Sequence, residues 1–366
     1  MRQLDGEVIR EAKGGIYAGR MGSSRAPRRA SAAAGTGELA LIETIRARAL
    51  RGAKNSAVRL GIGDDCAVLA VPGGHEMLVT TDFSLEGRHF RRDWHPARSI
   101  GHRTLARGLS DLAAMGAEPM AAFLSLALPA SVARNRAWVR GFLDGFVGLA
   151  ERFGVTLAGG DTCEAMGELV LADVVLVGSA ATGTALRRSG ARVGDLLYST
   201  GWMGGATQEQ LQLELGPRWY RKAKAGDGRF PHLFPEPRIA QGQALRQRGL
   251  ATACMDLSDG LSTDLARLCG ASGVAAEVDF NALPDDPRLR GADGEYTYRC
   301  VVHGGEDYEL LFTAAPGTKV PKRLLGVKVT QIGRIVKARA RRPQMMLVGS
   351  GGERRPLESA GWVYPL

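Results

Sequence analysis

Apolar and polar positions alternate between helical and strand spacing from about residue 37 onward. Apolar residues recur at near-helical intervals in 37–50, and Leu105, Leu109 and Leu112 form one stripe in 98–116. Short apolar runs end at Thr80-Thr81-Asp82, at Pro129 and before Gly159, and 168–180 forms another, as expected of buried strands. Because such strands and helices alternate to the end of the chain, the pattern predicts an α/β (α+β) architecture.

The same pattern divides the chain. Residues 1–36 are rich in Gly, Ala, Ser and Arg and lack periodicity, so they are predicted to form a disordered N-terminal extension. A glycine- and arginine-rich break at 187–201 predicts a boundary between a domain at 37–186 and a domain at 187–366. A length of 366 residues is also typical of about two domains.

The charge is concentrated near the C-terminus. The net charge is +10, and residues 319–355 hold eleven Lys and Arg with Glu353 as the only acid. Such a segment attracts polyanions, but no recognisable nucleic-acid module accompanies it, so we expect a solvated surface and no specific nucleic-acid partner. None of the five cysteines forms a C-x-x-C pair, which fits a reducing cytoplasm. The sequence contains no run of about 20 uncharged apolar residues, so no membrane span is predicted.

Acidic residues recur beside glycines and at the ends of predicted strands. Asp64 and Asp65 follow the Gly-x-Gly of GIGDDCAVL, Asp82 ends an apolar run, and Asp161 follows a Gly-Gly pair. Asp256 and Asp259 flank Leu-Ser before an amphipathic stretch. Ligand crevices of α/β folds form at strand ends, and hard cations such as Mg²⁺ take oxygen ligands. The chain has no Gly-Lys dipeptide and hence no Walker A loop, so bound phosphates would be held through metal ions on carboxylates.

Each acid also has an ordinary structural explanation. Asp111 lies four residues after Arg107 and could form a helix-surface ion pair. Ser258 suits an N-cap, with Asp259 in the first turn of the following helix. Asp161 could be a plain turn residue. Taken together, these explanations require several independent coincidences, which favours a phosphate and Mg²⁺ site.

Seven motifs in order resemble one known family. They are GIGDDCAVL, TTDFSLEGRHF, GLSDLAAMGAEP, GGDTC, RSGARVGD, MDLSDGLSTDL and GGEDYELLF. Over about residues 37–366 the chain is similar to the thiamine-monophosphate kinase family, within the superfamily of the aminoimidazole ribonucleotide and selenophosphate synthetases. The resemblance implies a two-domain ATP-binding fold whose N-terminal domains pair their sheets in a homodimer. It also implies ATP-dependent phosphorylation of thiamine monophosphate to thiamine diphosphate, by direct in-line transfer assisted by several Mg²⁺ ions.

The resemblance also implies roles for individual residues. The implied metal ligands are Asp65, Thr80 or Thr81, Asp82, Asp111, Asp161, Asp256 and Asp259. The implied ATP contacts are Gly160, Asp161, Arg188 and Ser258. The implied contacts to thiamine monophosphate are His89, Glu306 and Trp362, where an aromatic face suits a cationic thiazolium.

Two departures and two alternatives accompany this prediction. Cys163 and Gly108 stand where the family often has Thr and Asn. One alternative is another ATP-dependent enzyme of the same superfamily. The other is a polyanion-binding protein that uses 319–355, which would leave the ordered aspartates unexplained.

Overall fold

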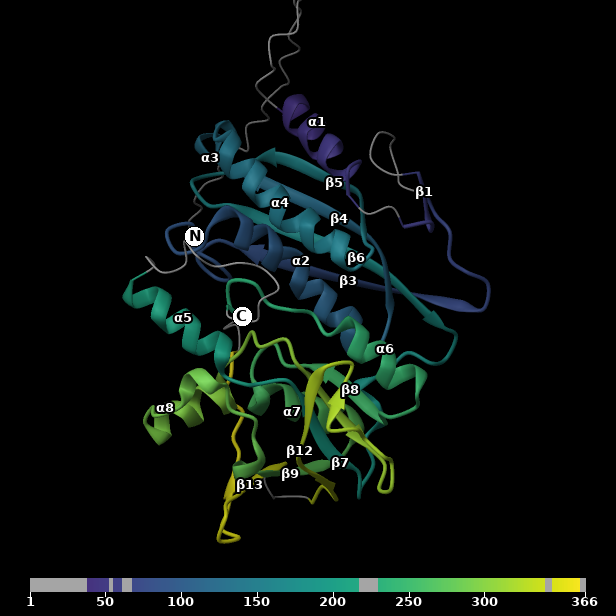
Figure 1. Cartoon of the computed structure of the whole chain (residues 1–366), viewed down its shortest axis with the longest axis vertical. Helices are drawn as coiled ribbons and strands as arrows, with labels where there is room; N and C mark the ends of the chain where they lie inside the picture. The colour runs from purple at the N-terminus through teal and green to yellow at the C-terminus, as the bar shows by residue number, and fades with distance from the viewer. Residues whose placement is uncertain (1–37, 53–54, 61–67, 217–229, 340–343, 363–366) are drawn as a thin grey trace, which may run out of the picture. The chain divides into compact units, whose positions relative to one another are not determined.

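The computed structural model describes residues 38–52, 55–60, 68–216, 230–339 and 344–362 (Figure 1). The predicted N-terminal extension and the GIGDD motif with Asp64 and Asp65 lie outside these residues.

Eight α-helices and fourteen strands are assigned within the described residues. The α-helices are α1 (Glu38–Ala49), α2 (Ala97–Ala114), α3 (Ala130–Arg134), α4 (Arg136–Arg152), α5 (Gly205–Leu215), α6 (Ile239–Gln247), α7 (Leu261–Ser272) and α8 (Gly294–Tyr298). Strands of the first half are β1 (Val58–Leu60), β2 (Val68–Leu69), β3 (His75–Leu85), β4 (Glu118–Leu128), β5 (Thr156–Glu164) and β6 (Leu171–Ala181). Strands of the second half are β7 (Leu196–Thr200), β8 (Ala253–Asp256), β9 (Ala275–Asp279), β10 (Leu310–Ala314), β11 (Arg323–Leu324), β12 (Val327–Val336), β13 (Met345–Val348) and β14 (Arg354–Pro356).

The first half is built on a four-stranded sheet in the order β3-β6-β4-β5. β6 pairs antiparallel with both β3 and β4, and β4 pairs parallel with β5, so the sheet is mixed. Helices α2 and α4 pack against each other over this sheet (Figure 1). Their apolar stripes, including Leu105, Leu109 and Phe142, are fully buried there and form most of the first core.

The second half is built on an eight-stranded mixed sheet. Its strands follow the order β14-β13-β9-β12-β7-β10-β8, with β11 paired to β12. Helix α7 packs beside β8 and β9, and Leu261, Leu265 and Leu268 bury the stripe that the sequence predicts. The described residues therefore form a mixed α/β fold with two sheets.

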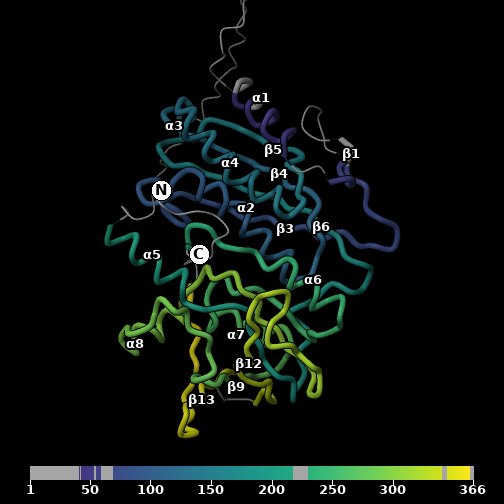
Figure 2. The backbone as a smooth tube through the Cα atoms, viewed as in Figure 1, coloured from purple at the N-terminus to yellow at the C-terminus, as the bar shows by residue number. Residues whose placement is uncertain are grey.

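Helix α2 contacts both halves. It packs on β3 and β6 of the first sheet and also touches β8 of the second sheet and helix α6. Figure 2 lets the reader follow the backbone from α2 to α6. A polar side chain on the α2 face toward the second half therefore lies between the two sheets.

Residues 130–152 form two helices, because the Asn135 side chain accepts a bond from the Trp138 N–H and starts α4 anew after α3. Two predicted strand ends were wrong, and each has a physical cause. Asp82 does not end a strand, because β3 stays paired with β6 through Leu85. Asp161 is likewise inside β5, which runs on to Glu164 beside β4.

No helix among the described residues is both long enough and apolar enough to cross a membrane. Four cysteines in the same residues, Cys163, Cys254, Cys269 and Cys300, are free thiols.

Candidate functional site

A polar stripe on α2 organises the site. Arg103, Arg107 and Asp111 are spaced by four residues, so they share one face of the helix. The rest of α2 is almost entirely buried among apolar side chains. This stripe faces the strand and loop residues of both halves, and each of its three members has a partner from elsewhere in the chain.

Asp111 belongs to a group of carboxylates with raised pKa values. Burial, together with the charge of Asp256, raises its pKa to about 6. Burial also raises the pKa of Asp256 to about 6, assisted by Asp264 and Asp82. The Thr80 hydroxyl donates to Asp111 at 2.5 Å, and the Ser110 hydroxyl donates to Asp256 at 2.7 Å. The group thus joins carboxylates of both halves and holds more negative charge than nearby cations compensate.

Asp82 is partly compensated. The Arg107 guanidinium donates to its carboxylate at 2.7 Å, although burial still raises the pKa of Asp82. The alternative explanation of Asp111 as the ion partner of Arg107 is wrong, because Arg107 turns to Asp82 and to the Tyr308 hydroxyl instead. Arg107 also lies 3.8 Å from Glu306, so it stands between the carboxylate group and the Glu306 region.

Of the two threonines, Thr80 faces the carboxylate group and Thr81 does not. Thr80 and Thr81 are successive residues of β3, so their side chains point to opposite faces of the sheet. Thr81 is exposed and its hydroxyl donates to Asp173 at 2.9 Å on that other face.

The DLSDG loop before α7 is held by an acid that sequence reasoning missed. Asp264 accepts bonds from the backbone N–H groups of Ser258 and Asp259 at 3.0 and 2.9 Å. Ser258 is therefore not the N-cap, and Asp259 is outside the helix, which begins at Leu261 after Gly260. Burial raises the pKa of Asp264 to about 6, so its two N–H donors and Arg267 only partly offset the cost of its charge.

Asp259 and Trp362 are neighbours through the backbone. The Trp362 N–H donates to the Asp259 carbonyl at 2.9 Å, while Arg267 lies 2.5 Å from the Asp259 carboxylate. Arg188 is exposed at the start of a 3₁₀ turn (Arg188–Gly190), and its charge lowers the pKa values of Asp111 and Asp256, so it lies near both.

Glu306 and His89 meet at a second polar cluster around Arg103. Arg103 is almost wholly buried and donates to Glu306 at 2.6 Å and to the His89 carbonyl at 2.9 Å. Burial alone would raise the pKa of Glu306, but Arg103 and His232 hold it well below its usual range. Burial lowers the pKa of His89 to about 3, and its Nδ1 accepts the Leu85 N–H at 3.0 Å, so this imidazole is neutral with its proton on Nε2.

The GGEDYEL motif supplies three acids with separate partners. Glu306 faces Arg103, while Asp307 accepts the N–H groups of Gly204 and Ala206 at the start of α5. Glu309 pairs with Arg238 at 2.5 Å. Glu306 and Tyr308 both have left-handed backbone angles, φ 67° and 51°, which non-glycine residues rarely adopt. Such strain is often found at ligand sites, and here it points Glu306 toward α2.

Gly160 and Asp161 lie on β5 at one edge of the first sheet, whereas Thr80 and Asp82 lie on β3 at the other edge. A Cβ at Gly160 would come within 1.9 Å of the Leu124 carbonyl oxygen, so only glycine fits beside β4. Asp161 is exposed and accepts a bond from the Thr162 N–H at 2.8 Å. No hydrogen bond or ion pair given for the described residues joins it to Asp82, Asp111 or Asp256.

The donor chemistry of the carboxylate group fits Mg²⁺. Its atoms are carboxylate and hydroxyl oxygens, the ligands that hard cations prefer. Within the described part of the chain, no three His, Cys, Asp or Glu side chains converge on one point that could hold a metal ion. Mg²⁺ usually keeps several waters and phosphate oxygens and takes few protein ligands, so excess negative charge without a closed cage is compatible with it.

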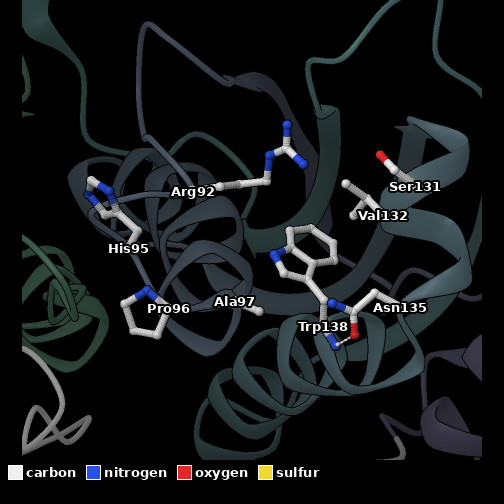
Figure 3. Close-up of a pocket in the computed structure, with 8 residues that line it drawn as sticks. All are labelled: Arg92, His95, Pro96, Ala97, Ser131, Val132, Asn135 and Trp138. Atoms are coloured by element: carbon white, nitrogen blue, oxygen red, sulfur yellow. Dashed lines mark hydrogen bonds between the residues drawn. The ribbon is translucent and has the colours of Figure 1, made fainter.

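A separate pocket of about 400 Å³ lies beside the loop before α2 and the α3–α4 pair (Figure 3). It is lined by Arg92, His95, Pro96, Ala97, Ser131, Val132, Asn135 and Trp138. None of these is among the predicted site residues, so this hollow and the carboxylate group are different features.

Some basic side chains of the 319–355 segment form ion pairs or lie over an aromatic ring. Arg334 and Arg354 both pair with Glu277, and Lys328 lies 4.1 Å from the centre of the Trp202 ring. Part of the positive charge predicted to attract polyanions is therefore engaged within the fold.

Two family models match the chain in succession. Residues 63–185 match the AIR synthase related protein, N-terminal domain, and residues 192–343 match its C-terminal domain. The thiamine-monophosphate kinase of Salmonella typhimurium (strain LT2) is 39% identical over 277 residues, covering 75% of this chain and 82% of that protein. The chain belongs to the thiamine-monophosphate kinase family.

Solved structures of this family agree. The crystal structure of thiamine-monophosphate kinase from Stenotrophomonas maltophilia K279a is 37% identical, with a TM-score of 0.72, covering 87% of this chain and 98% of that one. AaThiL complexed with AMPPCP and TMP is 27% identical, with a TM-score of 0.65, covering 89% of this chain and 96% of that one. The family resemblance inferred from the seven motifs is confirmed.

Sequence reasoning missed Arg103, Asp264, His95 and His232. Arg103 had a signal, because it stands four residues before Arg107 and eight before Asp111 in an otherwise apolar helix. Asp264 also had one, in its place within the first turn of α7. The two histidines had no sequence signal, because only the fold brings them together.

Proposed function

We propose that this chain transfers a phosphoryl group from ATP to thiamine monophosphate, giving thiamine diphosphate and ADP. Its membership of the thiamine-monophosphate kinase family supports this reaction. The observation that carries the proposal is the group of buried carboxylates, Asp82, Asp111 and Asp256, drawn from both halves and raising one another's pKa. Such a group is suited to hold cations that in turn hold phosphates.

The transfer is direct. A phosphate oxygen of thiamine monophosphate forms a bond to the γ-phosphorus of ATP, the bond from that phosphorus to the β,γ-bridging oxygen breaks, and ADP leaves with the electron pair. The attacking oxygen is already an anion, so the protein needs no strong general base and no covalent intermediate. Its residues bind and orient the two substrates, which is the main source of rate in such reactions.

Mg²⁺ would be held by Asp65, Thr80, Asp82, Asp111, Asp161, Asp256 and Asp259, with Thr81 on the other face of β3. Bound Mg²⁺ supplies positive charge that offsets the charge of the phosphate oxygens. We assign ATP contacts to Gly160, Asp161, Arg188 and Ser258. Arg188 is supported by its position near Asp111 and Asp256, and Ser258 by its place beside Asp259.

We assign the thiamine end of the substrate to His89, Glu306 and Trp362. Arg103 links the first two residues, and a neutral imidazole beside an anionic carboxylate is compatible with a cationic thiazolium. The half-exposed Trp362 ring could stack on that cation, and its backbone bond to Asp259 places it next to the predicted metal ligands.

We also propose a homodimer formed through the outer face of the first sheet. Met77, Val79 and Phe83 alternate along β3 and are 53, 57 and 61% exposed, an unusual apolar row for a solvated strand. A second copy presenting the same row would cover it. Val79→Lys is expected to give monomers by light scattering, whereas Val193→Lys, at an exposed valine elsewhere, should not. A dimeric Val79→Lys protein would contradict this interface.

We place the domain boundary between 186 and 187, supported by family models that end at 185 and begin again at 192. We place the reaction in the cytoplasm, where the free thiols of the described residues would stay reduced.

The function is tested with purified protein, Mg·ATP and thiamine monophosphate. Thiamine diphosphate should form in proportion to ADP. Asp259→Asn should nearly abolish turnover while the protein stays folded, and Asp144→Asn, which changes an exposed acid paired with Arg48, should not. Folded wild-type protein that makes no thiamine diphosphate would refute the proposal.

A further inference from the structure

Two buried histidines lie beside Glu306 but belong to none of the predicted site residues. The Nε2 atoms of His95 and His232 are 3.0 Å apart, and each residue is at most 3% exposed. His95 precedes α2, and His232 follows α5 in the chain. His95 is also one of the residues that line the pocket of Figure 3, where its ring points away from Trp138.

The proton positions of this pair follow from Glu306. His232 Nδ1 lies 3.0 Å from a Glu306 carboxylate oxygen but is not aligned for a regular hydrogen bond, so a proton on Nδ1 faces that anion and is attracted to it. The Nε2 of a neutral His232 is then an acceptor, and His95 must donate to it from its own Nε2. This leaves His95 Nδ1 as an acceptor, which the Arg91 backbone N–H meets at 3.1 Å, while the Arg91 carbonyl oxygen lies 3.0 Å from the same nitrogen.

Both imidazoles are kept neutral. Burial lowers the pKa of His232, and Arg103 lowers it further, while burial and His232 lower the pKa of His95. The opposite arrangement would place an unprotonated His232 Nδ1 against the carboxylate, where two acceptors repel. Proton donation from His95 to His232 therefore leaves the His232 Nδ1–H facing Glu306, and this direction avoids the repulsion.

The backbone that carries His232 is fixed from two sides. Glu209 of α5 accepts the His232 N–H at 2.9 Å, and Arg103 of α2 donates to the His232 carbonyl. Ser99 donates to the next carbonyl, that of Leu233, at 2.7 Å. With its backbone held, the His232 ring has a definite direction in which to offer Nδ1–H.

We propose that His232 and His95 are positioning residues for the thiamine-binding end of the site, because they hold the Glu306 carboxylate in place through a one-way row of neutral imidazole N–H groups. Arg103 already offsets part of the Glu306 charge, and a neutral His232 orients the carboxylate without adding a further cation, which would oppose binding of a thiazolium. This inference rests on the proposed function, since Glu306 is assigned there to the substrate.

The first experiment determines which ring nitrogens of the two histidines carry a proton, and it does not depend on catalytic activity. Nitrogen-15 NMR of histidine-labelled full-length protein at pH 7 should show His232 protonated at Nδ1 only and His95 protonated at Nε2 only. His232→Asn and His95→Gln assign the two signals. The opposite tautomers, or a ring protonated at both nitrogens, would overturn the proposal.

The second experiment separates positioning from scaffolding. His232→Ala removes the donor to Glu306, so the KM for thiamine monophosphate should rise about tenfold to a hundredfold, with little change in kcat or in the KM for ATP. His232→Asn keeps an N–H near the Nδ1 position and should restore much of that KM. Val147→Ala, at a buried core valine of α4 away from this segment, should lower the unfolding midpoint without changing the KM.

The outcomes are distinguishable. If His232→Ala and His232→Asn share the wild-type KM, or if kcat and both KM values change together with the unfolding midpoint, the positioning role is wrong. If the wild type makes no thiamine diphosphate while the NMR tautomers are as stated, the proposed function fails and the hydrogen-bonded row stands.

Discussion

Two buried polar clusters on the same face of α2 differ in how their charges are balanced. Around Arg103, the Glu306 carboxylate faces a guanidinium at 2.6 Å and the His232 ring at 3.0 Å, and its pKa is held low. Around Asp111, the charged neighbour with the largest effect on its pKa is another carboxylate, that of Asp256. The pKa values of both residues are raised to about 6.

The difference indicates what each cluster needs from outside. The Arg103 cluster is complete within the protein, so it can serve as a rigid wall for a substrate. The Asp111 cluster carries its negative charge at an energetic cost that bound cations would offset, which is the expected property of a site that recruits Mg²⁺ with a nucleotide. Arg107 touches both, through Asp82 at 2.7 Å and Glu306 at 3.8 Å, and so separates the two kinds of charge.

The largest effect is expected when the cation of the balanced cluster, the cluster of Arg103, Glu306 and His232, is removed. Arg103→Met should destabilise the protein by about 3–5 kcal/mol, because Glu306 is left as a largely unpaired buried charge. Urea unfolding measures this. Adding Glu306→Gln to Arg103→Met removes that charge and should recover part of the loss. An unchanged midpoint for the single variant, or a double variant no better than it, would mean that Glu306 does not depend on Arg103.

Removing a charged group from the Asp111 cluster, whose negative charges are not balanced, should stabilise the metal-free protein, whereas removing Arg103 destabilises it. Asp111→Asn should lower kcat by about 10²- to 10³-fold, the usual loss when one electrostatic contact to the reacting groups is removed. In EDTA the same variant should unfold at a higher temperature than the wild type, because it removes a carboxylate that repels Asp256. Asp144→Asn, at an exposed acid, should change neither quantity. An Asp111→Asn protein that is less stable in EDTA would show that this carboxylate is balanced after all.

The sequence predicted the unbalanced cluster better than the balanced one. Carboxylates beside glycines are visible as letters, so Asp82, Asp111 and Asp256 were named before the fold was known. The strand ends were misplaced, because pairing of β3 with β6 and of β5 with β4 carries each strand past the polar residues that had been taken as its limit. Pairing with a neighbouring strand is a long-range contact, which local pattern does not report.

The balanced cluster depends on contacts of high sequence separation. Glu306 contacts Arg103, which is 203 positions away in the sequence, and His232, which is 74 positions away. The sequence around His232 is rich in proline and has no periodicity. Arg103 could have been found from its spacing on α2, since a polar residue four positions from Arg107 shares its face. The residues that contact this face of α2 could not have been predicted, because their position depends on how β8, β10 and α5 place the GGEDYEL loop.

Glu209 provides a finer test, since it is a carboxylate with a raised pKa that bonds the His232 backbone beside the balanced cluster. Burial raises its pKa from 4.5 to about 7, although the His232 and Leu233 N–H groups lower it. Between those values the folded protein keeps a proton that the unfolded chain has lost, so rising pH destabilises the wild type. Glu209→Gln lacks this effect, and its stability relative to the wild type should rise by about 3 kcal/mol from pH 4.5 to pH 8 in urea unfolding. Glu151→Gln, at a half-exposed acid, should show no such trend. A flat or falling difference for Glu209→Gln would mean that the two backbone donors balance this charge as Arg103 balances Glu306.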